Sequence, residues 1–553
     1  MKHFRVNVTL KYNQFMKKVE KQMNDYANKL KQLEPMVATS GVSRRDFIQL
    51  AIMTGLSVTA AESMFSKAYA AGSPKKGGTF RVGMEGGSAT DSLDPRTYAD
   101  SVMIAASLAV YNGMIEFDNA GNPTGELLES WEAKPGAVEW IFNVRKGIKF
   151  SNGKTLDADD ILYSIGIHRG GETKSPAKGI LAQIANIKAI SPNQIAITLS
   201  GGNADFPVIL GDYHLVVVPN GFTDWENPIG TGGYTLASFE PGVRLVFKNR
   251  GDYWKEGRAN FDTFELLNIQ DVAARTAALQ SGQVDAVNRL DARTVDLMKR
   301  NKDLNILRTK GTGNRFCFVS RVTSPGFSNK DLRLALKWGI DREKIIESVY
   351  SGYAVPGNDH TLDAYNPYYN TDMPQRTYDP DKAAYHFKKS GLNGEITLST
   401  SEGAWGSAVD CAQLYQESMA KAGITLNVKK ESADGYWSNV WLKEPFCAVY
   451  WARRLSADQT FTQVYGSGSD WNDSDWRVPA FDKLVEAARV ELDEEKRKAQ
   501  YFECQEMIAE DGGMVCFGIT DYLDGYSSKV MGTEAHARYD MNDLRIAEKG
   551  WFA

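Results

Sequence analysis

The stretch Leu127–Ser164, LLESWEAKPGAVEWIFNVRKGIKFSNGKTLDADDILYS, combines a strand pattern with a helix pattern. Its central part, VEWIFNVRKGIKF, is apolar at alternate positions, which predicts a β-hairpin with Lys146 and Gly147 at the turn. A helix is expected to follow, because Asp157 suits an N-cap and Asp160, three residues later, favours the positive helix end. Strand and helix patterns that alternate in this way favour an α/β fold.

The same alternation continues on both sides of this stretch. GGTFRVGME predicts a first strand, and GTGGYTLASFEPGVRLVFKNRGDYW predicts a later β-rich region. Asp271 can cap the helix pattern VAARTAALQSG, which ends at Gly282. A comparable unit is SNKDLRLALKWGIDREKIIESVYSG, whose apolar residues keep helical spacing up to Ile340 and which Gly352 closes.

The composition is that of an ordinary globular protein. The chain has 553 residues, of which 42% are hydrophobic and 24% charged, so it is too long for one core and predicts two or three domains. Its net charge of −5 and its pI of about 5.9 argue against a basic face that grips phosphates. We therefore expect no nucleic-acid partner.

The N-terminal residues resemble a twin-arginine export signal. A basic region leads to SRRDFIQLAIMTGLSVTA, which contains Arg44 and Arg45, and Ala68 and Ala70 offer an A-x-A cleavage site before Ala71. The apolar run is roughly fourteen residues and is interrupted by polar ones, too short to span a bilayer. We expect signal cleavage, a periplasmic location and no stable membrane insertion; the alternative is a retained amphipathic helix.

The cysteine residues are compatible with buried thiols. All five lie after the expected cleavage site and none forms a C-x-x-C pair: Cys317, Cys411, Cys447, Cys504 and Cys516. An odd number leaves at least one unpaired, and buried apolar thiols are the interpretation that we favour. Two of them can form a disulfide in the oxidising periplasm, but the sequence does not indicate which two.

No enzyme signature is present. G-x-S-x-G, H-E-x-x-H and G-x-G-x-x-G are absent, and in GIKFSNGKT five residues separate Gly147 from Gly153, one too many for a phosphate loop. The histidines are scattered, and the acidic run from Asp157 to Asp160 fits a helix cap better than a metal site. The sequence predicts no catalytic residues, no metal and no cofactor.

Aromatic residues are dense in the last third of the chain. Large flat side chains with a polar edge suit a pocket that closes over a polar ligand, although about half of them would equally suit a core. They are Trp405, Tyr436, Trp437, Trp441, Tyr450, Trp451, Trp471 and Trp476.

Four segments together resemble the periplasmic solute-binding proteins of the dipeptide, oligopeptide and nickel type, which serve ABC importers. They are the opening stretch, NPIGTGGYTLASFEPGVRLVFKNRGDYW with RTAALQSGQVDAV, FSNKDLRLALKWGIDREKIIESVYSGYAVP, and YDPDKAAYHFKKSG. The resemblance implies a two-lobed α/β (Venus-flytrap) fold whose first lobe carries an extra subdomain. It also implies that the chain crosses between lobes near GNRFCFVSR and returns near MVCFGITDYL.

On this basis the chain is divided into four parts. Residues 1–70 are the signal and an N-terminal extension, and residues 71–312 form lobe I with an inserted subdomain at about 105–225. Residues 313–520 form lobe II, and residues 521–553 return to lobe I.

The resemblance implies a binding function without catalysis. A small-molecule or peptide-like ligand is enclosed when the lobes close, and the transmembrane permease subunits of an ABC importer recognise the closed, monomeric protein. Alternatives are an oligopeptide receptor of the same family, a periplasmic chaperone or signalling receptor that uses the same clamp, and a metallophore or haem receptor. A hydrolase is disfavoured because no nucleophile and base pattern is present.

The segment WARRLSADQTF, from Trp451, is where the chain departs from its relatives. In dipeptide-binding members an aspartate three residues after this tryptophan holds the ligand's α-ammonium, and Arg454 stands there instead. The segment that supplies a carboxylate-binding arginine aligns with STSEGAWGSAVD, which has Glu402 and no arginine. The hypothesis is an anionic or zwitterionic ligand that Arg454, with Arg453 as second candidate, engages in a fork geometry.

The alternative is that both arginines are structural and brace the loop through Glu402 or Asp458. The candidate ligand-binding residues are Arg454, Trp451, Arg453, Glu402, Trp405, Trp437 and Asp458.

Overall fold

A computed structural model describes residues 74–553, apart from residues 99 and 455. It has two parts, Gly77–Gly550 and a second part made of Met1–Lys76 with Trp551–Ala553. In the second part, the described residues contain the short strand β21 (Trp551–Phe552). The expected export signal and its cleavage site lie outside the described residues.

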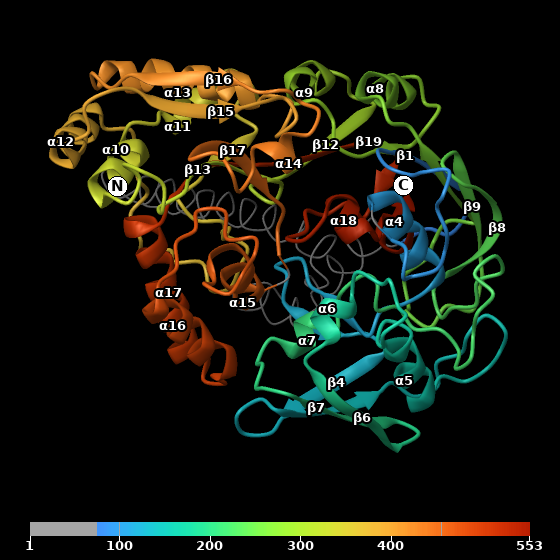
Figure 1. The fold of residues 1–553 in the computed structure, drawn as a ribbon. Helices are drawn as coiled ribbons and strands as arrows, with labels where there is room; N and C mark the ends of the chain where they lie inside the picture. Colours follow the sequence, from blue (N-terminus) through green and yellow to red (C-terminus); the bar gives the residue numbers. More distant parts are fainter. Residues whose placement is uncertain (1–73, 99, 455) are drawn as a thin grey trace, which may run out of the picture. The chain divides into compact units, whose positions relative to one another are not determined.

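The first sheet of Gly77–Gly550 has seven strands in the order β12-β19-β11-β1-β10-β9-β8 (Figure 1). The expected first strand is confirmed as β1, which lies at the centre and pairs in parallel with β10 and β11. Its alternate residues Phe80, Val82 and Met84 are buried. The strands are β1 (Thr79–Met84), β8 (Tyr234–Glu240), β9 (Arg244–Asn249), β10 (Thr263–Asn268), β11 (Ala286–Val287), β12 (Leu304–Thr309) and β19 (Tyr522–Ser527).

Short helices accompany this sheet. The expected cap is confirmed: the Asp271 side chain accepts a hydrogen bond from the backbone N–H of Ala274 at the start of α8. The remaining elements of this region are α4 (Ser101–Val110), α8 (Val272–Gln280), α9 (Ala292–Met298), β20 (Val530–Met531), α18 (Asp540–Leu544) and α19 (Ile546–Lys549).

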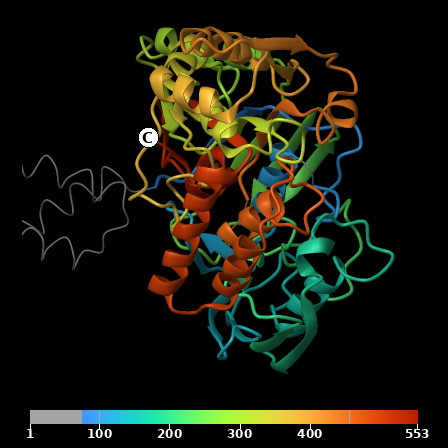
Figure 2. The same cartoon turned by 60° about the vertical axis from the view of Figure 1, so that its left-hand side comes forward.

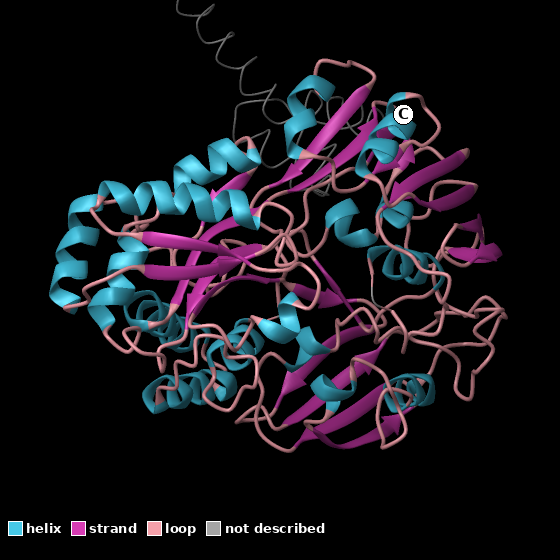
Figure 3. Ribbon diagram, turned by 45° about the horizontal axis from the view of Figure 1, so that its top comes forward, coloured by secondary structure: helices cyan, strands magenta, loops and turns pink. Residues whose placement is uncertain are grey.

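A four-stranded antiparallel sheet, in the order β4-β5-β7-β6, contains the opening stretch of the sequence (Figure 3). The helix expected after Asp157 is confirmed as α5, with reciprocal capping by Asp157 and Asp160. The elements are β2 (Ile115–Phe117), β3 (Pro123–Gly125), β4 (Leu128–Ala133), β5 (Glu139–Val144), α5 (Ala158–Gly166), α6 (Lys178–Leu181), β6 (Ile184–Ser191), β7 (Gln194–Leu199) and α7 (Phe206–Ile209).

The expected strand pairing across Lys146 and Gly147 is wrong, although these two residues do form a turn in which Gly147 has a φ of 79°. β5 pairs with β4 and β7 instead, and the chain reverses later, where Lys149 forms a bridge with Thr155. The alternating pattern is real, because β5 has one buried face, and Phe150 joins the same core. Alternation identifies a strand with one buried face but does not identify its partner.

The third sheet has six strands in the order β14-β18-β13-β17-β15-β16. The helical unit expected to run past Ile340 is two helices, α10 and α11, because the chain breaks at Gly339. Its elements are β13 (Arg315–Ser320), α10 (Lys330–Trp338), α11 (Arg342–Tyr350), β14 (Ala354–Pro356), α12 (Pro380–Ser390), β15 (Ile396–Thr400), α13 (Ala408–Lys421), β16 (Leu426–Lys430), α14 (Tyr436–Asn439), β17 (Phe446–Trp451), α15 (Ala457–Thr460), a π-helix (Phe461–Tyr465), α16 (Pro479–Val490), α17 (Glu494–Asp511) and β18 (Met514–Thr520).

The chain passes between the seven-stranded and six-stranded sheets twice. It goes from β12 to β13 through residues 310–314, and from β18 to β19 at Asp521. Helices α16 and α17, which precede β18, lie side by side (Figure 2). The domain limits given above stay a prediction.

A largely buried charge cluster joins the C-terminal segment to β2 and to Glu126, the residue after β3. Arg545 donates from its two terminal nitrogens to the two carboxylate oxygens of Glu126, each at 2.9 Å, and Lys255 lies 2.6 Å from Glu126. The cluster consists of Glu116, Glu126, Lys255, Arg258, Arg545, Glu548 and Lys549. Opposite charges and hydrogen bonds offset the cost of removing these groups from water.

The segment just before that cluster has a left-handed backbone. Residues Met541–Leu544 have φ values of 51°, 57°, 65° and 59°, a conformation that costs a non-glycine residue roughly 1–2 kcal/mol. The backbone N–H of Met541 donates to Asp524, and the side chain of Asn542 accepts from the N–H of Glu534. These two hydrogen bonds offset part of the free energy that the left-handed backbone conformation costs.

Candidate functional site

The candidate site begins where β17 ends. Trp451 is the last residue of β17, opposite Arg315 of β13, and its side chain is buried. Its indole N–H donates to the Asp473 carboxylate at 3.0 Å. Trp451 is therefore held on both its backbone and its side chain, and it fixes the start of the loop that carries the two arginines.

Arg453 is engaged by protein groups. Its Nε lies 3.1 Å from Asp363 Oδ2, and one terminal nitrogen donates to the carbonyl oxygen of Ala537, which belongs to the C-terminal segment. Asp363 also pairs with Arg315, so two guanidinium groups share one buried carboxylate. The guanidinium group of Arg453 therefore has its charge and hydrogen-bond partners within the protein and needs no ligand to supply them.

Arg454 has different surroundings. Its Nε donates to Gln463 Oε1 at 2.5 Å and its Nη1 to the carbonyl oxygen of Ala452 at 3.2 Å. Its guanidinium lies 5.3 Å from the ring of Trp451 and 5.9 Å from that of Trp471. In the part of the chain that the structure describes, no carboxylate lies within 4 Å of it.

Burial lowers the pKa of both arginines below its usual value. For Arg453 the neighbouring Asp363 carboxylate opposes that shift, whereas for Arg454 the nearby Arg315 adds to it. The two arginines therefore differ in the charge that lies beside them and not in the direction of the shift.

Asp473 lies behind the tryptophan rings. It is buried, and burial raises its pKa to about 7, although the hydrogen bond that the Trp451 indole donates opposes the rise. At neutral pH it therefore supplies only part of a negative charge to the loop. Its clear structural effect is to orient the Trp451 indole ring.

A chain of aromatic rings borders the loop. The ring of Trp437 lies 5.4 Å from that of Tyr450 and 5.8 Å from that of Trp441, and the ring of Trp441 lies 5.9 Å from that of Trp471, each pair in an edge contact. Trp437, Tyr450 and Trp471 remain 37%, 38% and 48% exposed. Of these three exposed rings, that of Trp471 lies beside Arg454, whereas Trp451, Tyr436 and Trp476 are buried.

The structure does not bring the other expected residues to Arg454. Glu402 lies 2.6 Å from Lys430, and Asp458 lies 2.8 Å from Arg489. The alternative in which Glu402 or Asp458 braces the arginines is therefore wrong, because each carboxylate has another cation as its partner.

Trp405 also lies elsewhere. Its ring stacks on Phe316 at 4.7 Å, and its indole donates to the Tyr350 hydroxyl at 3.1 Å, on the sheet face that carries Phe318. The expected set thus separates into Arg454, Trp451 and Trp437 with its ring neighbours, the braced Arg453, and three residues with other contacts.

Sequence reasoning missed three residues of this arrangement: Asp363, Gln463 and Asp473. Asp473 lies in SDWNDSDW, between two of the tryptophans of the aromatic-rich region. The density of aromatic residues was therefore a signal that could have pointed to Asp473. Asp363 is 90 residues from Arg453 in a loop without any pattern, and nothing local points to it.

No helix of residues 74–553, leaving aside 99 and 455, is long and apolar enough to cross a membrane.

Comparison with known proteins identifies the family. Residues 122–473 match the family described as bacterial extracellular solute-binding proteins, family 5 Middle. The di/tripeptide-binding protein 3 of Pseudomonas aeruginosa is 26% identical over 467 residues, which cover 76% of this chain and 85% of that protein.

Two solved structures show the same fold. One is the ABC transporter-associated periplasmic binding protein DppA from Helicobacter pylori in complex with the peptide STSA, with a TM-score of 0.68, 21% identity, and coverage of 86% of this chain and 98% of that one. The other is the PBP AgaA from A. tumefacien R10 in complex with agropinic acid, with a TM-score of 0.69, 20% identity, and coverage of 86% and 99%.

The expected two-lobed α/β fold of a periplasmic binding protein is confirmed by these structures. The family match covers well over half of the chain, and its members bind solutes rather than transform them. This chain belongs to the bacterial extracellular solute-binding proteins of family 5.

Proposed function

We propose that this protein is the periplasmic substrate-binding component of an ABC importer, and that it captures a small anionic or zwitterionic, peptide-like organic solute. The observation that carries the proposal is Arg454, a half-buried guanidinium that has no carboxylate partner among the described residues. The ligand would be enclosed between the two lobes and delivered to the transmembrane permease subunits by a monomeric protein.

The charge balance around the loop supports an anionic ligand. Asp363 is shared by Arg315 and Arg453, and no described carboxylate pairs with Arg454. Partial removal of a cation from water costs free energy, and a bound anion offsets that cost. An anion at this position is therefore attracted more strongly than it would be in bulk water. The ammonium of a free dipeptide would instead be repelled.

The geometry of the guanidinium supports recognition in its plane. The rings of Trp451 and Trp471 lie near Arg454, and Gln463 and Ala452 engage its Nε and Nη1. The remaining terminal nitrogen, Nη2, has no hydrogen-bond partner within residues 74–553 as described. A carboxylate, sulfonate or phosphate can accept from that side of the fork, while the exposed rings cover an apolar part of the solute.

Export by the twin-arginine pathway, with cleavage between Ala70 and Ala71, is part of the same proposal. It is supported by the paired Arg44 and Arg45 and by the A-x-A site in the sequence. The names of the relatives agree with a peptide-like or acidic solute, since one is a di/tripeptide-binding protein and another was solved with agropinic acid.

The second candidate is an oligopeptide receptor of the same family. β15 pairs with β17 only at Ser399 and Cys447, so the backbone from Ala448 to Trp451 leaves β15 and has one edge without a paired strand of the described chain. An extended peptide can bind such an edge through main-chain hydrogen bonds and needs few charged side chains.

The test is to recover the ligand and then to remove the arginine. Small molecules released by denaturing the protein purified from its native periplasm are identified by mass spectrometry, and their affinity is measured by calorimetry with wild type and Arg454→Ala. Loss of a charge-assisted hydrogen bond should weaken binding of an anion by about 100-fold. Arg293→Ala, at a residue whose side chain is 77% exposed, is the control that should leave affinity unchanged.

Each result decides between the two candidates. One anionic compound whose affinity depends on Arg454 supports the proposal. A mixture of peptides that binds equally well to wild type and Arg454→Ala refutes the anion site and supports the oligopeptide receptor.

A further inference from the structure

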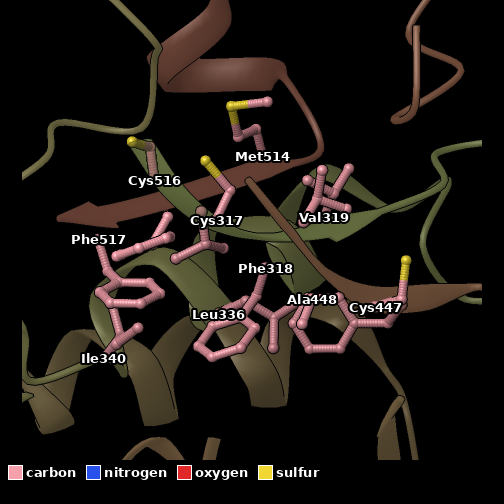
Figure 4. Packing of buried hydrophobic residues seen from close by; sticks show 14 of the residues in the cluster. Cys317, Phe318, Val319, Leu336, Ile340, Cys447, Ala448, Met514, Cys516 and Phe517 are labelled. Atoms are coloured by element: carbon pink, nitrogen blue, oxygen red, sulfur yellow. The ribbon is translucent and has the colours of Figure 1, made fainter. Parts of the chain in front are cut away.

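Three of the five cysteine thiols lie on one face of the six-stranded sheet. All five cysteines are buried free thiols, and three of them lie on neighbouring strands: Cys317 on β13, Cys447 on β17 and Cys516 on β18 (Figure 4). Tyr465 of the π-helix approaches the same face, where its hydroxyl donates to Met514 Sδ at 3.2 Å.

The strand register places two of these thiols directly opposite each other. β13 and β18 are antiparallel, and Cys317 pairs with Cys516, two positions along from the pair of Val319 and Met514 and directly before a register shift that separates it from the pair of Phe316 and Gly518. Residues that face each other across antiparallel strands project to the same side of the sheet, so both sulfur atoms lie on one face. Figure 4 shows both side chains on that face.

The hydrogen-bond pattern fixes the type of this pair. The N–H of Ser320 donates to the carbonyl oxygen of Gly513 at 2.9 Å, so those two residues form a hydrogen-bonded pair. Pair types alternate along an antiparallel ladder, which makes Cys317 and Cys516, three positions away, a non-hydrogen-bonded pair. The Cys516 carbonyl accordingly accepts from Asp359 on its other side.

In a pair of this type, the two Cα atoms lie at a distance that a disulfide can bridge. Non-hydrogen-bonded residues have Cα atoms about 4.5 Å apart, within the span of about 4.4–6.8 Å that disulfides bridge. Cys447 is placed less well, because it faces Val319 rather than a cysteine. Cys411 and Cys504 lie on the helices α13 and α17, and neither has a cysteine opposite it in the sheet.

We propose that Cys317 and Cys516 are a disulfide-forming pair, which closes when the chain folds in the presence of a disulfide oxidant such as oxidised glutathione. One thiolate attacks the oxidant's S–S bond and releases one thiolate of the oxidant. The second cysteine then attacks the mixed disulfide and releases the other. The two cysteines lose two protons and two electrons, and the oxidant is reduced to two thiols.

The link must form before the strands are fully packed. Both thiols are completely buried in the folded protein, and burial, together with the neighbouring Cys516, raises the pKa of Cys317 well above its usual value. A thiol in that state is a poor nucleophile and is inaccessible to the oxidant. We therefore expect the folded, reduced protein to react slowly and the refolding chain to form the link.

The position of the link connects it to the passages between the sheets. β13 follows the first passage and β18 precedes the second, so a bond between Cys317 and Cys516 joins both segments at their six-stranded end. Movement of one sheet region relative to the other would then be confined to residues 310–314 and to Asp521. This inference is independent of the ligand proposed above.

The experiment is to refold the full chain and count thiols. The protein is unfolded in denaturant with reductant, refolded in oxidised and reduced glutathione, and alkylated after a second unfolding. We expect the number of alkylated cysteines to fall from five to three, and a peptide that links Cys317 to Cys516 to appear by mass spectrometry and to disappear on reduction.

Two variants make the result specific. Cys317→Ala should retain four alkylated cysteines and give no linked peptide, whereas Cys447→Ala, on the same sheet face, should retain two and give the same linked peptide as wild type. Five alkylated cysteines in refolded wild type, or a link that contains Cys411, Cys447 or Cys504, would overturn the proposal. Circular dichroism of wild type checks that refolding is complete.

Discussion

Asp363 is the carboxylate on which two arginines converge, and its replacement by asparagine should be one of the most destabilising single changes near the loop. Arg315 is completely buried and Arg453 is 16% exposed, and both contact Asp363. Removing one partner of a buried ion pair costs about 3–5 kcal/mol, because the remaining charge stays buried without compensation. We expect Asp363→Asn to cost that amount rather than twice it, since both arginines keep carbonyl acceptors.

The complementary change should be milder. Arg453→Gln leaves Asp363 paired with Arg315, and it removes one charge-assisted hydrogen bond and the contact with the Ala537 carbonyl oxygen. The expected cost is about 1.5–3 kcal/mol. The carboxylate contacts two cations, and each cation has further partners. The informative result is therefore which of the two variants, Asp363→Asn or Arg453→Gln, loses more free energy of unfolding.

The assay is equilibrium unfolding in urea at neutral pH, followed by tryptophan fluorescence and by circular dichroism. The two probes must give coincident transitions before free energies of unfolding are compared. Arg293→Gln, which alters an exposed ion pair, is the control and should change stability by less than about 0.5 kcal/mol. The reasoning is refuted if Arg453→Gln costs as much as Asp363→Asn, or if Asp363→Asn costs less than about 1 kcal/mol.

Three further changes test other parts of the structure. The folded-state pKa of Asp473, raised to about 7 from 3.8, makes its contribution to stability fall as pH rises between these values, so Asp473→Asn should flatten that dependence in urea titrations at several pH values. Glu126→Gln should cost about 3–5 kcal/mol in thermal or urea unfolding, because it leaves Arg545 buried without its bidentate partner. Gly513→Ala should cost about 3 kcal/mol or more, since its Cβ would lie 2.1 Å from a backbone carbonyl oxygen, whereas Gly468→Ala, with open space around it, should leave the urea midpoint almost unchanged.

Local signals in the sequence predicted local structure well. The cap at Asp157 and the strand β1 could be predicted because each depends on residues a few positions apart. The helical unit ending at Gly352 was found, but its division at Gly339 was not, because helical spacing continues across a short break. The family resemblance supplied the two-lobed fold, which local patterns alone would not have given.

Long-range contacts explain what the sequence could not predict. The two adjacent arginines are identical in type, and only the folded chain shows that Arg453 meets Asp363 while Arg454 meets Gln463. The failed hairpin has the same origin, since β5 takes its partners β4 and β7 from outside the segment that displayed the pattern. In both cases the partner lies outside the local segment of sequence that carries the pattern.

The strand order of the seven-stranded sheet has a consequence for how the protein is synthesised. β19 comes from residues 522–527 and lies between β12 and β11, so when a ribosome has made β12 the sheet still has a gap in its interior. The six-stranded sheet uses strands from one continuous stretch, 315–520, and can be completed as soon as that stretch has emerged. The seven-stranded sheet therefore begins to form first but can be completed only last, and during that interval its open strand edges are free to pair with other chains.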